Sequence, residues 1–150
     1  MKRMKYDLTV IIPVYNTGKY LRRCLESIIH QEGIEQSALR VICINDGSTD
    51  NSQTIIEEFI EKYPFIEIFN KENGGLADVR NKGLQFLNDS LYTVSLDSDD
   101  YWCESFLLEF NKIKNKLRGY AVTSGGKELI DSLTPYGSVF EVEKKLEETN

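Results

Sequence analysis

The stretch Leu8-Thr-Val-Ile-Ile-Pro-Val14, followed by Tyr15-Asn-Thr-Gly18, decides the fold. Its first part is apolar and rich in β-branched residues, which is typical of a buried strand, and its second part has turn chemistry. From Lys19 to Gln31, apolar residues recur with the 3.6-residue period of a helix that buries one face. The start of the chain therefore predicts a strand, a loop and an amphipathic helix.

The same alternation continues along the chain. Further strands are expected at 41–44, 65–69, 92–96 and 120–123, and further helices at 51–63, about 76–87 and 106–113. Asp50 and Gln53 predict a capped start for the first of these helices. Continuous apolar strands that alternate with amphipathic helices indicate an α/β fold with a mostly parallel, Rossmann-like sheet and helices on both faces.

Composition limits the classes of function. The chain has 150 residues, 41% of them hydrophobic, which suits one domain, and its net charge of −6 gives no reason to expect nucleic acid as a partner. No apolar run approaches the roughly 20 residues that span a bilayer, so we expect a cytoplasmic protein. The three cysteines lack metal-site spacing and are expected to be reduced, with Cys24 and Cys43 buried. The pattern weakens after Gly125, which divides the chain into a domain at 1–125 and an uncertain segment at 126–150.

Loops of unusual composition follow the expected strands rather than the helices. In open α/β sheets, ligands bind at the carboxyl ends of the strands, so these loops predict a single site at one sheet edge. The loops are Pro13-Val-Tyr-Asn16, Asn45-Asp-Gly-Ser-Thr-Asp50, Asn73-Gly-Gly75 and Asp97-Ser-Asp-Asp100.

Asp97-Ser-Asp99 is the sharpest chemical signal. Two carboxylates one residue apart at a strand end present hard oxygen ligands, which suit Mg²⁺ or Mn²⁺ beside substrate phosphates. The alternatives are a solvated turn that caps the next helix, and a phosphatase in which Asp97 is the nucleophile. A calcium loop of the EF-hand type is excluded, because Tyr101 and Trp102 stand where its third acidic ligand and its glycine belong.

The other loops are less specific. Asp46 is suited to accept hydrogen bonds from a nucleobase or ribose, and Gly47 allows close backbone approach, although an Asx turn explains both. Asn73-Gly-Gly75 is either a ligand loop or a flexible turn, and Arg80 either contacts the nucleotide or faces solvent. Tyr101 and Trp102 fit a sugar or base pocket as well as the core.

Taken together, the four motifs resemble family 2 glycosyltransferases in order and spacing, over roughly residues 7 to 103. They are Val10-Ile-Ile-Pro-Val-Tyr-Asn16, Asn45-Asp-Gly-Ser-Thr-Asp50, Asn73-Gly-Gly75 with Arg80-Asn81, and Leu96-Asp-Ser-Asp-Asp100. The resemblance implies a GT-A fold and transfer of a sugar from a nucleotide-sugar, usually a UDP-sugar, to an acceptor hydroxyl with inversion at the anomeric carbon.

The resemblance also implies residue roles. Asp46 recognises the nucleobase, Asp97 contacts the ribose or nucleotide, and Asp99 binds a divalent cation, Mn²⁺ or Mg²⁺, on the diphosphate. The acceptor is a saccharide or a lipid-linked molecule, and the full protein is compatible with peripheral association at the inner face of the membrane. The expected nucleotide-sugar-binding residues are Pro13, Val14, Tyr15, Asn16, Asp46, Gly47, Asn73, Gly74, Arg80, Asp97 and Ser98.

Two departures from the family pattern stand out. The family carries its general base later in a longer catalytic domain, and here Glu128, Asp131, Glu141 and Glu143 lack that context and are expected to be surface charges. The chain is therefore a fragment or has a diverged acceptor half, and a non-catalytic nucleotide-sugar-binding module is the alternative function. The second departure is Asp78-Val79 before Arg80, where the family often has smaller residues.

Overall fold

The computed structural model describes residues 5–32 and 36–113. The elements in chain order are β1 (Tyr6–Val14), α1 (Gly18–Ile29), the 3₁₀ turn η1 (Gln36–Ala38), β2 (Leu39–Asp46), α2 (Ser52–Lys62), β3 (Ile66–Lys71), α3 (Leu76–Gly83), the 3₁₀ turn η2 (Leu84–Asp89), β4 (Ser90–Ser95) and α4 (Phe106–Ile113). None of the helices in these ranges has the length and apolar character needed to cross a bilayer.

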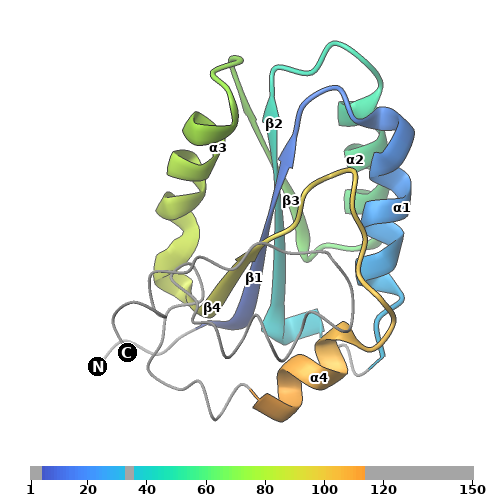
Figure 1. Cartoon of the computed structure of the whole chain (residues 1–150), viewed down its shortest axis with the longest axis vertical. Helices are drawn as coiled ribbons and strands as arrows, with labels where there is room; N and C mark the ends of the chain where they lie inside the picture. The colour runs from blue at the N-terminus through green and yellow to red at the C-terminus, as the bar shows by residue number, and fades with distance from the viewer. Residues whose placement is uncertain (1–4, 33–35, 114–150) are drawn as a thin grey trace.

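The described strands form one parallel sheet in the order β3-β2-β1-β4, which confirms the predicted α/β class (Figure 1). The chain builds outward from β1 through β2 to β3, and then returns to place β4 on the other side of β1. Such a reversal of strand order opens a crevice at the carboxyl ends of the strands, where α/β sheets bind their ligands. The carboxyl end of β1 therefore marks the place for a site.

Helices cover both faces of the sheet (Figure 1). Alternate residues of a strand point to opposite faces, so Val10 and Ile12 of β1 join the larger core with α1, α2 and α4. Ile11, between them, joins a smaller core with Ile44 and with Val79 of α3. This double burial explains why the strands have continuous apolar sequences. The prediction that Cys24 and Cys43 are buried is also confirmed.

One local prediction was wrong and a second was only partly right. The third helix was expected to run to about Leu87, but α3 ends at Gly83, which packs against the side chain of Ile11, and the chain continues as the 3₁₀ turn η2. Asp50 was expected to cap α2 together with Gln53. Oδ1 of Asp50 does accept the N–H of Ser52, the first residue of α2, at 2.9 Å, but the amide of Gln53 bonds Glu57 instead, also at 2.9 Å. The cap position is Asn51, without a side-chain cap bond.

The strand expected at 120–123 and the segment 126–150 lie outside the described residues, and so do the acidic residues considered for a general base. The division of the chain at residue 125 stays a prediction.

Candidate functional site

The loops that follow β1, β2 and β4 meet at one edge of the sheet, around a cavity of about 330 Å³. Parallel strands bring their carboxyl ends to the same edge, and α3 closes one side of the space. Pro13, Val14, Tyr15, Thr17, Asp46, Leu76, Val79, Asp97, Ser98 and Asp99 line the cavity. The acidic groups predicted for base recognition and for metal binding therefore share one cavity.

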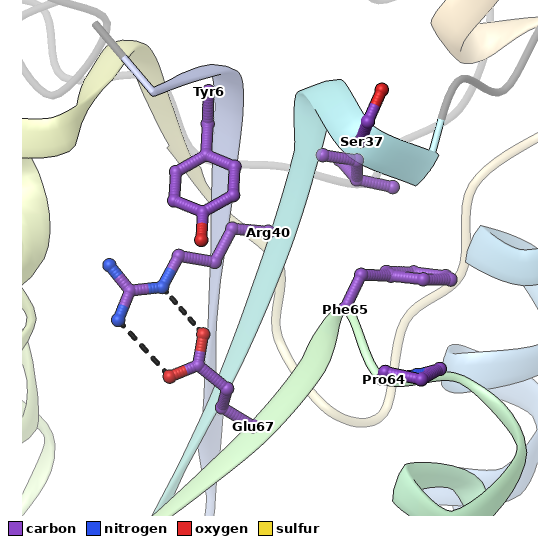
Figure 2. Close-up of a pocket in the computed structure, with 7 residues that line it drawn as sticks. Tyr6, Ser37, Arg40, Pro64, Phe65 and Glu67 are labelled. Carbon is purple, nitrogen blue, oxygen red and sulfur yellow. Dashed lines mark hydrogen bonds and ion pairs between the residues drawn. The ribbon is translucent and has the colours of Figure 1, made fainter.

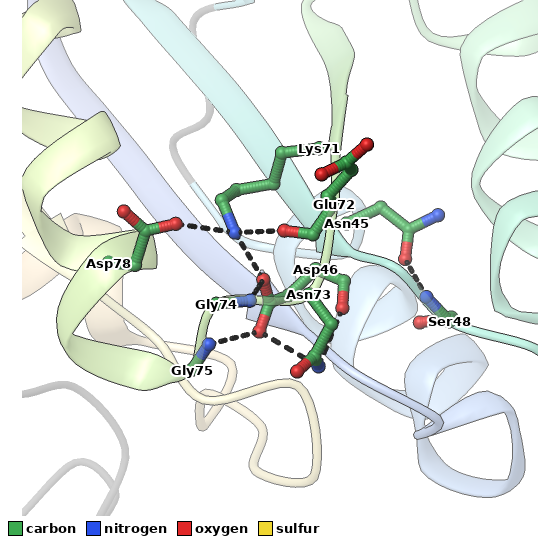
Figure 3. Close-up of polar contacts among 9 residues, drawn as sticks. All are labelled: Asn45, Asp46, Ser48, Lys71, Glu72, Asn73, Gly74, Gly75 and Asp78. Atoms are coloured by element: carbon green, nitrogen blue, oxygen red, sulfur yellow. Dashed lines mark hydrogen bonds and ion pairs between the residues drawn. The ribbon is translucent and has the colours of Figure 1, made fainter.

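Asp46 ends β2 and is held by the loop that follows β3 (Figure 3). Its Oδ1 accepts hydrogen bonds from Lys71 Nζ and, at 2.9 Å, from the Gly74 N–H. Its Oδ2 accepts the Gly75 N–H at 3.0 Å, and the amide of Asn73 reaches the Asp46 carbonyl oxygen at 3.0 Å. The side chain of Asp46 is 4% exposed, so these donors replace the water that a surface carboxylate would have.

The same contacts set the charge state of Asp46. Burial alone raises the pKa of its carboxyl, but the hydrogen bonds from Lys71, Gly74 and Gly75 outweigh burial and hold the pKa below its usual range. The hydrogen bonds from Lys71 to Asp46 and Asp78 raise the pKa of the Lys71 ammonium. Both partners are therefore charged at neutral pH.

Gly47 and Asn73 meet where the loops after β2 and β3 cross. Gly47 has a φ of +75°, and a Cβ built on it would lie 2.9 Å from the backbone nitrogen of Asn73. Gly47 was predicted to allow close backbone approach, and the backbone that approaches it is that of Asn73 in the same chain.

Asn16 fastens the loop after β1 to the loop after β2. Its side-chain oxygen accepts the N–H groups of Thr49 at 2.7 Å and Asp50 at 3.2 Å, and its own N–H donates to Ser48 Oγ at 3.0 Å. The φ of Asn16 is +51°, a left-handed value that asparagine tolerates better than most residues. Asp50 in turn accepts the Gly18 N–H at 2.9 Å, at the start of α1.

The acidic loop after β4 rests on α1. Thr17 donates its hydroxyl to Ser98 Oγ at 2.7 Å, and Arg23 donates to the carbonyl oxygen of Asp99 at 3.3 Å. Below them, the buried thiol of Cys24 points to the carbonyl oxygen of Asp97 at 3.7 Å. The start of α1 and its first turns therefore fix the position of the acidic loop and its carboxylates.

The acidic loop has a donor set that fits a divalent cation. Asp97, Asp99 and Asp100 each offer a carboxylate oxygen, and these oxygens lie within 4.8 Å of one another. Ligands of one Mg²⁺ ion sit about 2.1 Å from it, so only small side-chain adjustments separate this arrangement from a coordinating one. Asp100 joins the cluster in addition to the predicted Asp97 and Asp99.

The predicted residues divide into two groups. Pro13, Val14, Tyr15, Asp46, Asp97, Ser98 and Asp99 line the cavity. The other group, which is absent from the cavity lining, consists of Asn16, Gly47, Asn73, Gly74 and Arg80. All of these except Arg80 shape the loops through the contacts described above, and Arg80 is exposed on α3. Their contacts with a nucleotide stay predictions.

Sequence reasoning missed Lys71, Thr17 and Leu76. Leu76 is half exposed at the start of α3 and lines the cavity. An exposed apolar residue beside a cavity is a signal of a binding site. Trp102, which fitted a pocket or the core equally well, is buried and stacks on Phe106 with ring centroids 3.9 Å apart.

A second cavity of about 310 Å³ lies at the opposite edge of the sheet (Figure 2). Its charged residues are Arg40 and Glu67, which form an ion pair at 2.6 Å. Because these charges neutralise each other, this cavity lacks the excess of carboxylates found at the first one.

The sequence profile described as "Glycosyl transferase family 2" matches residues 9–122. The chain belongs to this family. Escherichia coli (strain K12) has a relative called "Uncharacterized glycosyltransferase YibD", 42% identical over 93 residues, which make up 62% of this chain and 26% of YibD.

Solved structures of glycosyltransferases share the fold. TarS of S. aureus in complex with UDP-GlcNAc superimposes with a TM-score of 0.67 at 27% identity, over 73% of this chain and 31% of TarS. The mannosyltransferase PcManGT of Pyrobaculum calidifontis, in complex with GDP-Man and Mn²⁺, gives a TM-score of 0.55 at 25% identity, over 68% of this chain and 29% of PcManGT. This family 2 chain therefore has the GT-A fold, and it spans about a third or less of each of these proteins.

Proposed function

We propose that this chain binds the donor in an inverting glycosyltransferase that transfers a sugar from a UDP-sugar to an acceptor hydroxyl and depends on a divalent cation. One observation carries the proposal: Asp46, from the loop after β2, and Asp97 and Asp99, from the loop after β4, line the same cavity. An acceptor for a base N–H and ligands for a diphosphate-bound cation are the two recognition elements that a nucleoside diphosphate requires.

Each end of the cavity has its own task. Asp46 is ionised and therefore accepts hydrogen bonds only, which suits the imide N–H of uracil. Asp97, Asp99 and Asp100 would hold Mn²⁺ or Mg²⁺, which neutralises the charge on the departing diphosphate. Tyr15, half exposed beside the cavity, offers an aromatic face to the base or ribose.

The acceptor side of the reaction needs a separate group. Among the described residues, the carboxylates that line the cavity are Asp46, Asp97 and Asp99, and each has a donor-side task. The base that deprotonates the acceptor hydroxyl is thus expected from another part of the protein. The inverting outcome is what the family resemblance implies, and the acceptor is proposed to be a saccharide or a lipid-linked molecule.

Calorimetric titration with UDP, with and without Mn²⁺, tests the donor claim. We expect UDP to bind, and Mn²⁺ to increase its affinity. Asp99→Asn should weaken binding by about tenfold or more with Mn²⁺ present and change it little without metal, since a charge-assisted contact contributes about 1.5–3 kcal/mol. Asp7→Asn, at the amino end of β1, removes a carboxylate from the opposite edge of the sheet and is the matched control.

Absence of UDP binding in the presence of Mn²⁺ refutes the donor claim. Enzymatic turnover is a separate question, which transfer assays on the full-length protein answer through the anomeric configuration of the product. Donor binding without transfer would favour the non-catalytic binding module.

A further inference from the structure

Lys71 occupies a buried position between two carboxylates at the donor edge (Figure 3). Its Nζ pairs with Asp46 and lies 2.6 Å from Asp78 Oδ2. The side chain of Lys71 is 7% exposed, compared with 44% for Asp78. Lysine is almost never buried without a partner, so this ammonium ties the ends of β2 and β3 to the start of α3.

The contacts leave a defined acceptor position on Asp46. A carboxylate has about four lone-pair sites. Lys71 and the Gly74 N–H use Oδ1, and the Gly75 N–H uses one site of Oδ2. The amide of Asn73 approaches the other site of Oδ2 only at 3.4 Å. A stronger donor from the cavity therefore finds one weakly used acceptor site.

We propose that Lys71 and Asp78 are a positioning pair for base selection: Lys71 keeps Asp46 an acceptor-only carboxylate, and Asp78 fixes Lys71. The inference rests on the proposed donor function and adds the reason for the choice of base. An ionised Asp46 accepts the N3–H of uracil and repels the N3 lone pair of cytosine. The proposed role also gives a reason for the carboxylate of Asp78 at a position where the family often has smaller residues.

Removing the charge of Lys71 should weaken this selection at low pH. A buried carboxyl that loses its cationic partner is protonated more readily, and a protonated Asp46 can donate to the N3 of cytosine. Other charged groups near Asp46 are Asp78 on α3 and, across the cavity, Asp97 and Asp99. These last two act on the diphosphate, which UDP and CDP share, so the ratio of UDP to CDP affinity isolates the base.

The test measures the dissociation constants of UDP and CDP with Mn²⁺ at about pH 5.5 and about pH 7.5, for the full chain and its variants. The unmodified protein gives the reference preference for UDP at each pH, because cytosine itself takes up a proton at N3 more readily at the lower pH. In Lys71→Met, the preference should fall about tenfold below that of the unmodified protein at the lower pH, because an Asp46 without its cationic partner is protonated more readily. Lys62→Met, an exposed lysine at the end of α2, is the matched control and should behave as the unmodified protein.

Asp78→Asn provides the second arm, because Asp78 is partly exposed and its loss leaves Asp46 paired with Lys71. It should weaken UDP binding about threefold at both pH values without changing the preference, and should add nothing in the Lys71→Met background. Circular dichroism verifies the folding of each variant. If Lys71→Met does not fold, Asp78→Asn decides the test, and an unchanged UDP affinity in Asp78→Asn overturns the inference. If the unmodified protein binds UDP but Lys71→Met has the same preference for UDP over CDP as the unmodified protein at both pH values, the inference fails and the donor function stands. If the unmodified protein does not bind UDP, both fail.

Discussion

Gly47→Ala should destabilise the protein because two separate penalties coincide at this residue. Gly47 has a φ of +75°, and a left-handed backbone costs an L-residue about 1–2 kcal/mol. The new Cβ would also lie 2.9 Å from the backbone nitrogen of Asn73, and relieving such an overlap in a packed region costs about 1–3 kcal/mol. Alanine reduces the freedom of the unfolded chain, which returns about 0.4–1 kcal/mol. The net loss is about 2–4 kcal/mol.

Gly75→Ala is the matched control for the backbone contact. Gly75 has a φ of +92° and a ψ of 171°, a region that is essentially limited to glycine and costs other residues about 1–3 kcal/mol. A Cβ on Gly75 would meet no atom within 4 Å, so this variant has only the conformational penalty. After the same unfolded-state gain, its net loss should be about 0.5–2 kcal/mol.

Urea denaturation followed by far-ultraviolet circular dichroism measures both losses on the same scale. The difference between the variants, about 1–2 kcal/mol, reports the contact between Gly47 and Asn73. Equal losses in the two variants, or a loss of less than about 1 kcal/mol in Gly47→Ala, would show that the loops after β2 and β3 do not cross as closely as described.

Two further predictions concern titration and reactivity. Burial raises the pKa values of Asp46 and Asp50, but hydrogen bonds outweigh burial and lower both pKa values below their usual range. The stability that these carboxylates contribute is therefore complete above about pH 4 and is lost as the pH falls through their pKa values in the folded protein. Acid titration of the circular dichroism signal should show this loss, and Asp50→Asn should make it shallower; an unchanged profile contradicts the assignment. Burial raises the pKa of Cys43 to about 12 and that of Cys24 well above its usual range. Iodoacetamide labelling of the folded protein at about pH 7.5, mapped by mass spectrometry, should therefore modify the half-buried Cys103 alone. Rapid labelling of Cys43 would contradict the fold.

The order of strands and helices followed from the sequence because it depends on local periodicity. A continuous apolar run such as Val10–Val14 is buried on both sides only in a sheet that is covered on both faces, so the run itself indicated the layers. The end of α3 was less accessible. Apolar residues continue beyond Gly83, but the contact of Gly83 with Ile11 is a tertiary event that periodicity does not contain.

The candidate site was predicted in outline, because parallel strands bring their carboxyl ends to one edge. The sequence thus grouped Asp46 with Asp97 and Asp99, and the structure has all three on one cavity. Lys71 was missed for a physical reason. Its pairing with Asp46 and Asp78 joins three different elements, and a lysine at the end of a strand is usually solvated. Cytoplasmic location stays a prediction.

The contacts among the loops also explain why several predicted ligand residues do not line the cavity. The side-chain oxygen of Asn16 is satisfied by the backbone of the loop after β2, and that loop bonds the start of α1 through Asp50. Thr17 joins the loops after β1 and β4. Each loop is therefore ordered by another loop, so the proposed donor would meet an edge that is already ordered, and binding would remove less conformational entropy. A motif residue in this family can thus shape the proposed donor site without lining it: Asp46 and Asp99 line the cavity, whereas Asn16 and Gly47 hold the loops that present them.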